Sequence, residues 1–163
     1  MNSFFLFLRC SLFFGCLFSS FVFAVINGVP LKGTEYESVV CLYNEKTGEI
    51  CTGTFVSPTQ VLTAAHCLGG DQNDKGEVNV QLSLVEFLDI KKGKYLVHGY
   101  SLKAFRHPYW VRRSGSNQWD IGIVEFKEGL AKNFSDIADK RPSVGEKVDL
   151  VGFGTDEIDV FSI

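Results

Sequence analysis

The stretch LTAAHCLGG, residues 62–70, places a histidine directly before a cysteine, behind a threonine and two alanines. Ala64 and Ala65 are small enough to allow close packing beneath the ring of His66, and Cys67 could fix the backbone one residue away through a disulfide. A histidine that acts as a general base needs a fixed tautomer and a ring that does not swing. The stretch therefore raises the question of which chemical partner His66 would serve.

Composition limits the answer to a packed globular protein. The chain has 163 residues, 45% of them hydrophobic and 21% charged, which is ordinary for one folded domain or two very small ones. The formal net charge is -3. A chain with no basic surplus has little to neutralise phosphates, so we expect no nucleic-acid partner.

The first 24 residues differ from the rest and read as an export signal. They are rich in phenylalanine and contain one basic residue, Arg9, and no acidic residue. Val22 and Ala24 are small residues at the positions that a signal peptidase inspects, so we expect cleavage after Ala24 and a mature amino terminus at Val25. The alternative is an uncleaved membrane anchor, which would need about 20 apolar residues to span the bilayer. With cleavage, we expect a secreted or periplasmic protein that has no membrane contact.

The remainder, residues 25–163, predicts short strands and almost no helix. Segments rich in valine, leucine, threonine and phenylalanine, some of them strictly alternating with polar residues, are separated by turn formers such as Gly69-Gly70 and Arg141-Pro142. About seven strands suggest one antiparallel barrel or sandwich. The expected strands are 38–44, 51–57, 60–64, 78–85, 94–105, 120–126 and 147–153.

Several segments, in the same order along the chain, resemble the trypsin and chymotrypsin family of serine endopeptidases. Thr63 to Cys67, TAAHC, is similar to the family's histidine motif and is the specific signal among them. Each of the other matches is weak by itself, and their common order along the chain is the stronger evidence for the resemblance. They are Val25-Ile26-Asn27-Gly28, Cys51-Thr52-Gly53-Thr54-Phe55-Val56, His107-Pro108-Tyr109, Asp120-Ile121-Gly122-Ile123-Val124 and Val151-Gly152-Phe153-Gly154-Thr155.

The resemblance implies an all-β fold built from antiparallel Greek-key barrels. The family has two such barrels with the active site between them, and the similarity covers residues 25 to about 155. We therefore expect a partial peptidase domain at 25–163, consisting of the first barrel and the segment that crosses to the second. The second barrel would be largely missing.

The resemblance also assigns the main site residues. It implies that His66 is the general base and that Asp120 accepts a hydrogen bond from the other ring nitrogen, which sets the tautomer and stabilises the imidazolium. Without the motif, His66 would read as a core histidine and Asp120 as a strand-end carboxylate. A zinc site built from His66, His98, His107 and the cysteines lacks the usual ligand spacing, so we expect no metal and no cofactor.

The resemblance implies a disulfide between Cys51 and Cys67. Residues 25–163 hold three cysteines, and an exported chain meets an oxidising compartment, so one bridge and one leftover thiol are expected. Cys41 would then be a buried free thiol. A bridge from Cys41 to Cys51 remains the alternative.

The nucleophile of the family is not recognisable. After Asp120 the serines are Ser135, Ser143 and Ser162, and none lies in the Gly-Asp-Ser-Gly-Gly setting that the family uses. We therefore expect no oxyanion hole, no specificity pocket and no peptidase activity from the isolated chain.

Three interpretations are compatible with this pattern. The first is a secreted serine endopeptidase homologue whose gene, or gene model, has lost its second half. The second is an exported, non-catalytic module that binds a protein partner. The third is complementation by a separate chain that carries the missing barrel. In the first case, a protein or peptide would be the substrate only after completion by a second barrel, and the exposed barrel face would favour aggregation or pairing.

Overall fold

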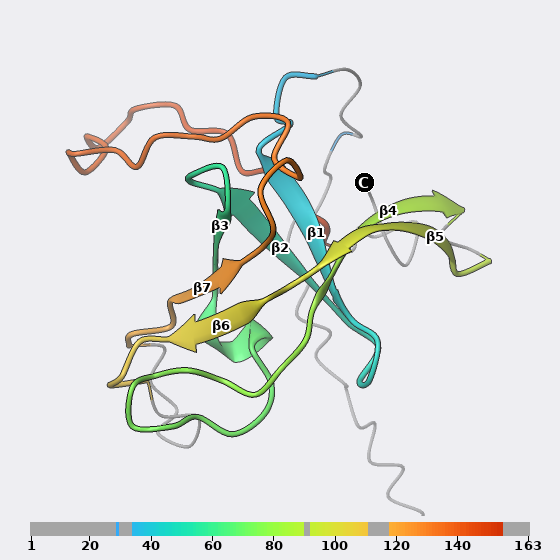
Figure 1. Ribbon diagram of the computed structural model, residues 1–163. Coiled ribbons are helices and arrows are strands. Elements are labelled where there is room, and N and C mark those ends of the chain that lie inside the picture. Colours follow the sequence, from blue (N-terminus) through green and yellow to red (C-terminus); the bar gives the residue numbers. More distant parts are fainter. Residues whose placement is uncertain (1–28, 30–33, 90–91, 111–117, 155–163) are drawn as a thin grey trace, which may run out of the picture.

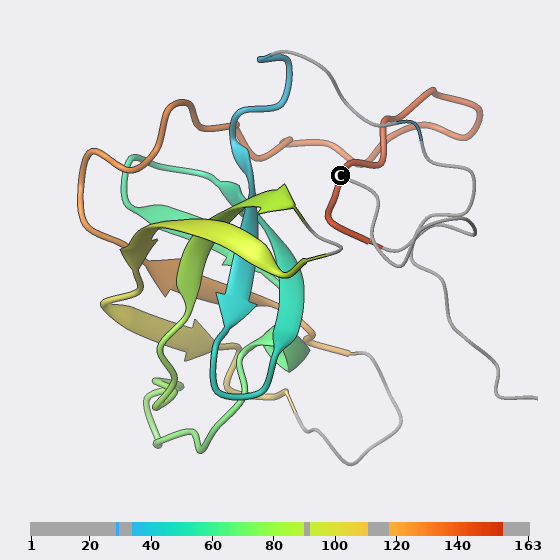
Figure 2. The same ribbon diagram turned by 90° about the vertical axis from the view of Figure 1, so that its right-hand side faces the viewer.

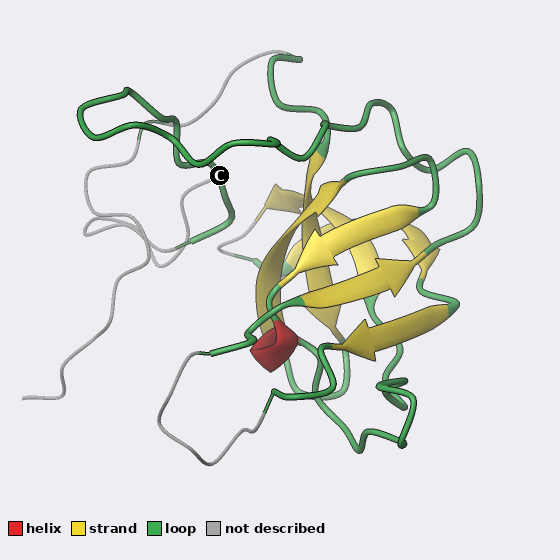
Figure 3. Ribbon diagram, turned by 90° about the vertical axis from the view of Figure 1, so that its left-hand side faces the viewer, coloured by secondary structure: helices red, strands yellow, loops and turns green. Residues whose placement is uncertain are grey.

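The computed structural model describes residues 29, 34–89, 92–110 and 118–154, and the regular elements within them are almost all β-strands. A single short turn of 3-10 helix, η1 (Ala65–Cys67), interrupts the strands and lies at the end of the sheet (Figure 3). The strands are β1 (Val39–Asn44), β2 (Glu49–Phe55), β3 (Gln60–Thr63), β4 (Ser83–Asp89), β5 (Lys94–Tyr100), β6 (Lys103–Arg106) and β7 (Gly122–Glu125).

All strand pairs among the described residues are antiparallel, and they form one sheet in the order β5-β4-β1-β2-β3-β7-β6 (Figure 1). The sheet curls strongly, as Figure 2 shows, and its two edge strands, β5 and β6, follow one another in the chain. No strand pairing of the described residues joins β5 to β6. The expected all-β antiparallel class is confirmed, and the curled sheet is consistent with the expected barrel.

The core is formed by the apolar residues that alternate along the strands, because successive side chains of a strand point to opposite faces. Leu42, Phe55, Val61, Val124 and Phe126 are each at most 2% exposed. The rings of Phe55 and Phe126 pack together with centroids 6.2 Å apart. This interior holds β2, β3 and β7 in a fixed register, and the ends of β3 and β7 carry the candidate site.

Three expected strands differ from the structure. Residues 78–82 are partly buried, but within the described ranges only Val78 among them takes part in a bridge, an isolated one to Gln72, and the ladder of β4 begins at Ser83. The expected strand at 94–105 is divided at Ser101 and Leu102, where the chain passes from one edge of the sheet to the other. Residues 147–153 form no strand, because no neighbouring strand among the described residues pairs with them.

The described segment after β7, residues 127–154, leaves the sheet and runs as an irregular, mostly exposed chain (Figures 1 and 2). Two of its backbone N–H groups donate hydrogen bonds to β2. The backbone N–H of Ser135 donates to the carbonyl of Phe55, at 2.8 Å, and the N–H of Phe153 donates to Oγ1 of Thr52, at 2.9 Å. Large apolar side chains along it are exposed, among them Ile137, Val144 and Leu150.

None of the helices in the described ranges is long and apolar enough to cross a membrane.

Candidate active site

His66 lies in a one-turn helix whose other residues are anchored in the interior. After β3 ends at Thr63, Ala64 is extended and residues 65–67 form η1. Ala65 and Leu68 are fully buried and Cys67 is 8% exposed. The side chain of His66 is 65% exposed. The buried neighbours fix the backbone, so the imidazole points into solvent from a rigid base.

The register of β3 and β7 brings Asp120 to His66. Thr63 is paired with Gly122 in the antiparallel ladder. Continuing that register for two residues sets Asp120 opposite Ala65, the first residue of η1. Two residues that are 54 positions apart in sequence are therefore adjacent where β3 ends and β7 begins.

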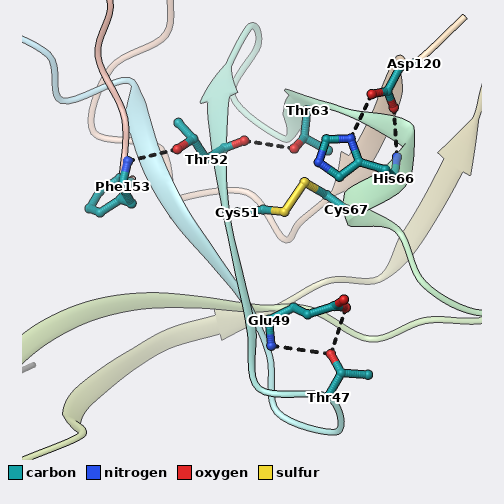
Figure 4. Close-up of a disulfide and its surroundings, with 9 residues drawn as sticks. All are labelled: Thr47, Glu49, Cys51, Thr52, Thr63, His66, Cys67, Asp120 and Phe153. Carbon is teal, nitrogen blue, oxygen red and sulfur yellow. Dashed lines mark hydrogen bonds and ion pairs between the residues drawn. A yellow bond between two sulfur atoms is a disulfide. The ribbon is translucent and has the colours of Figure 1, made fainter. Parts of the chain in front are cut away.

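Two hydrogen bonds join His66 to Asp120 (Figure 4). Nδ1 of the imidazole lies 2.7 Å from Oδ2 of Asp120, and the backbone N–H of His66 donates to Oδ1 at 2.9 Å. An ionised carboxylate can only accept, so Nδ1 carries the proton in this arrangement, and a neutral ring then has an unprotonated Nε2. The first N–H groups of a helical turn lack partners within it, and the carboxylate satisfies them. The sequence prediction that these two residues meet agrees with this geometry.

The same contacts hold the pKa of Asp120 below its ordinary value. Burial of the carboxyl raises the pKa. Hydrogen bonds from the side chain and backbone of His66, the charge of His66 and the backbone N–H of Ala65 lower it by more than burial raises it. The carboxylate therefore stays ionised at neutral pH. An ionised Asp120 fixes the tautomer of His66.

The expected disulfide between Cys51 and Cys67 is confirmed. The two Cα atoms are 6.1 Å apart, and the bridge joins β2 to η1 directly beside His66 (Figure 4). Cys41 is a buried free thiol, so the alternative bridge from Cys41 to Cys51 was wrong. The bridge fixes the helical turn that carries His66 to the central part of the sheet.

Thr52 links this part of the sheet to the segment at 127–154. Its carbonyl accepts a hydrogen bond from Oγ1 of Thr63 at 2.8 Å, and its own Oγ1 accepts one from the N–H of Phe153 (Figure 4). A Cβ added at Gly152 would lie 2.8 Å from Oγ1 of Thr52, so glycine is needed for this approach. The glycine-containing segment at 151–154 is thereby held close to the disulfide.

The other two histidines do not join the site as metal ligands. His98 pairs with Glu86, its Nε2 lying 3.0 Å from Oε2. The ring of His107 stacks on Trp119. In the described ranges, potential metal ligands come together at Cys51, His66 and Cys67, all within 4.8 Å of one another. The two cysteines are joined as a disulfide and offer no thiolate, so this group does not fit a structural zinc.

One feature of the site was not foreseen from the sequence: the ring of Trp119, which is 52% exposed, stacks on the ring of His107. The aromatic spacing alone gave no signal for the stack, which depends on the register between β6 and β7. The expected mature terminus, Val25, lies outside the described residues.

Known proteins contain segments similar to this chain. A family model described as Trypsin matches residues 25–161. A curated relative, "Snake venom serine protease 3" of Protobothrops jerdonii, is 44% identical over 43 residues. Those residues are 26% of this chain and 16% of the relative, so the chain matches only a small part of that protein's length.

Proposed function

Because the chain belongs to the trypsin family of serine proteases, whose members act on protein substrates, we propose that it supplies the proton acceptor and the carboxylate partner of a peptide-hydrolysing site. His66 is the acceptor and Asp120 is the partner. The observation that carries the proposal is the 2.7 Å contact between Nδ1 of His66 and Oδ2 of Asp120, which commits Nδ1 to the carboxylate and leaves Nε2 toward solvent.

The chemistry assigned to these residues is proton transfer. A serine hydroxyl that attacks a peptide carbonyl loses its proton, and Nε2 of His66 takes that proton as the new carbon–oxygen bond forms. Asp120 stabilises the imidazolium that results and keeps the ring in the productive tautomer. The imidazolium then gives the proton to the leaving amine as the carbon–nitrogen bond breaks.

The attacking hydroxyl comes, in this proposal, from outside the described residues. Several described serine side chains bond elsewhere, among them Ser38 to Ser135 and Ser83 to Glu45. Among the described residues no hydrogen bond joins a serine to His66. Removal of the nucleophile from such a site costs about 10⁶ in rate, so without it the chain has no measurable peptidase activity. In this proposal the oxyanion donors and the specificity pocket belong with that hydroxyl.

Export is part of the same proposal. Residues 1–24 act as a cleaved signal and Val25 becomes the amino terminus, without a separate propeptide. Support comes from the sequence of the leader and from the start of the family match at residue 25. Amino-terminal sequencing of the exported protein is expected to begin at Val25, and any other start would contradict this step.

The test compares the chain with an extended form. The nucleotides beyond the codon of Ile163 are read in all three frames for Gly-Asp-Ser-Gly-Gly, and the extended protein is expressed where the motif follows. The extended protein is expected to hydrolyse casein. We expect His66→Ala and Asp120→Asn to lower its kcat by about 10⁴-fold or more. His98→Ala, a histidine paired with Glu86 away from the site, is the matched control and should leave kcat unchanged.

Two results would overturn the assignment. Hydrolysis of casein by the 163-residue chain, abolished by His66→Ala, would show that the chain already contains its nucleophile. Hydrolysis by the extended protein that survives His66→Ala would show that His66 is not the base.

A second candidate function is an exported module that binds a protein partner without catalysis. The observation that favours it is a recess of about 340 Å³ between β1, β4 and the segment after β7, lined mainly by apolar side chains that include Val39, Cys41, Val85, Leu130 and Phe153. A partner's apolar side chain could occupy it.

Light scattering after size-exclusion chromatography separates the two candidates. An isolated binding module should be soluble and monodisperse. Half of a two-barrel enzyme should aggregate or pair, because its exposed apolar side chains along residues 127–154 would lack their cover.

A further inference from the structure

A cluster of three aromatic rings lies next to Asp120 and has no part in the chemistry proposed above. The rings of Trp119 and His107 are stacked, with centroids 4.5 Å apart and planes 13° from parallel. Tyr109 meets the edge of Trp119 at 5.9 Å and lies 5.6 Å from His107. Such pairs have a preferred geometry and therefore restrict the residues that carry them.

The backbone at Trp119 is held in a conformation that a large side chain rarely adopts. Its φ is 63°, and it is the one non-glycine residue with positive φ among those described. A bulky residue in this region is strained and persists only where its surroundings hold it there. The N–H of Ile121 donates to the carbonyl of Trp119 at 2.8 Å, closing a tight turn with Asp120 at its centre. The direction of the Asp120 side chain therefore depends on the conformation of Trp119.

His107 contacts both neighbours of Asp120. Its ring stacks on Trp119, and its backbone N–H donates to the carbonyl of Ile121 at 3.0 Å. The ring is itself oriented, because the N–H of Tyr109 lies 3.3 Å from its Nδ1. His107 follows directly on β6, which is paired with β7 through Arg106 and Gly122. The stack is thus fixed to the sheet on one side and to the turn on the other.

We propose that Trp119 and His107 form a clamp that positions Asp120, and through Asp120 the ring of His66. Both are positioning residues and neither touches the reacting atoms. The clamp holds residues 119 and 121 on either side of the carboxylate, so the strained turn cannot relax and turn Asp120 away from His66. The catalytic purpose of the clamp rests on the proposed function, but its effect on Asp120 does not.

The exposure of Trp119 argues against a role in packing alone. A ring that served the core would be buried, whereas Trp119 is 52% exposed. The chain's second tryptophan, Trp110, gives a comparison in the same loop. It lies under the guanidinium of Arg106, 4.9 Å from ring centroid to Cζ, and takes no part in the stack on His107.

The test follows the carboxyl carbon of Asp120 and the Nδ1 proton of His66 by NMR in the full chain. Trp119→Asn removes the ring but keeps a residue that tolerates positive φ, and His107→Ala removes the other half of the stack. Trp119→Tyr restores an aromatic ring. Trp110→Asn makes the same replacement as the first variant at the matched tryptophan.

We expect Trp119→Asn and His107→Ala to raise the pKa of Asp120 toward its ordinary value, because the hydrogen bonds from His66 that lower it become weaker. The Nδ1 proton of His66 should exchange with water about two- to tenfold faster, the loss expected for one aromatic pair. Trp119→Tyr should keep both values near those of the unaltered protein, and Trp110→Asn should leave them unchanged.

An unchanged pKa of Asp120 and unchanged proton exchange in Trp119→Asn and His107→Ala would overturn the clamp. Equal shifts in Trp110→Asn would also overturn it, since they would indicate general loosening of the loop. The readout needs no substrate. A failure of peptide hydrolysis would therefore leave the clamp standing, and a failure of the clamp would leave the roles of His66 and Asp120 in hydrolysis untouched.

Discussion

Removal of the disulfide between Cys51 and Cys67 should destabilise the fold by about 3 kcal/mol. The two cysteines are 16 residues apart, and closing a loop of that length lowers the conformational entropy of the unfolded chain. The loss raises the free energy of the unfolded chain by about 3 kcal/mol at room temperature. The change is the double replacement of Cys51 and Cys67 by alanine, which leaves no new free thiol. The ratio of folded to unfolded protein should fall about 150-fold.

Urea unfolding followed by tryptophan fluorescence measures this difference. The m value should rise, because the unfolded chain without its bridge exposes more surface to denaturant. Cys41→Ala is the matched control: Cys41 is buried but lies outside the bridge, so its replacement should cost only about 1 kcal/mol.

The reasoning would be refuted by a loss of less than about 1 kcal/mol in the double variant with an unchanged m value. Such a result would mean that the bridge does little to restrict the unfolded chain. A control that is destabilised as strongly as the double variant would also refute it, because the effect would then come from losing any buried cysteine.

Three further predictions concern the packing and ionisation of the same region. Gly122→Val should destabilise the fold by about 1–3 kcal/mol in urea unfolding, because an added Cβ would lie 2.6 Å from Cδ1 of the fully buried Leu68; a neutral result would contradict that packing. Burial raises the pKa of the Cys41 thiol to about 12, so this thiol should react with Ellman's reagent at neutral pH only after the protein unfolds, and rapid reaction of the native protein would contradict this. The free energy of unfolding should also fall as the pH rises above the ordinary thiol range. The pKa of Asp120 is lowered in the folded protein, so its contribution to stability is complete above the ordinary aspartate pKa and is lost as the pH falls through the lowered value. Asp120→Asn should therefore make the free energy of unfolding less dependent on pH in acid, and an unaltered pH profile would count against the hydrogen bonds at this carboxylate.

Much of the fold could be predicted because alternation of apolar and polar residues reports which side chains face the interior. The expected strands at 38–44, 51–57 and 60–64 correspond closely to β1, β2 and β3. The same signal misplaced β4, because Val78 and Leu82 are buried although both precede the ladder of β4, which begins at Ser83. Alternation predicts burial, and strand pairing also needs a neighbour in register.

The candidate site could be predicted only in part. His66 and Asp120 were foreseen from a motif, and the ladder between β3 and β7 explains why they meet. The stack of Trp119 on His107 could not be foreseen, because no local pattern connects residues at the two ends of the segment that joins β6 to β7. The strained φ of Trp119 is likewise a property of the folded backbone, and nothing in the sequence around it requires a positive value.

The most direct test of the central claim is the tautomer of His66. The ¹⁵N chemical shifts of its ring, measured in alkaline solution where the imidazole is neutral, report which nitrogen carries the proton. Protonated Nδ1 and unprotonated Nε2, with this preference lost in Asp120→Asn, is the result that we predict. A proton on Nε2, or a tautomer unaffected by Asp120→Asn, would contradict the assignment of His66 as a base held by Asp120.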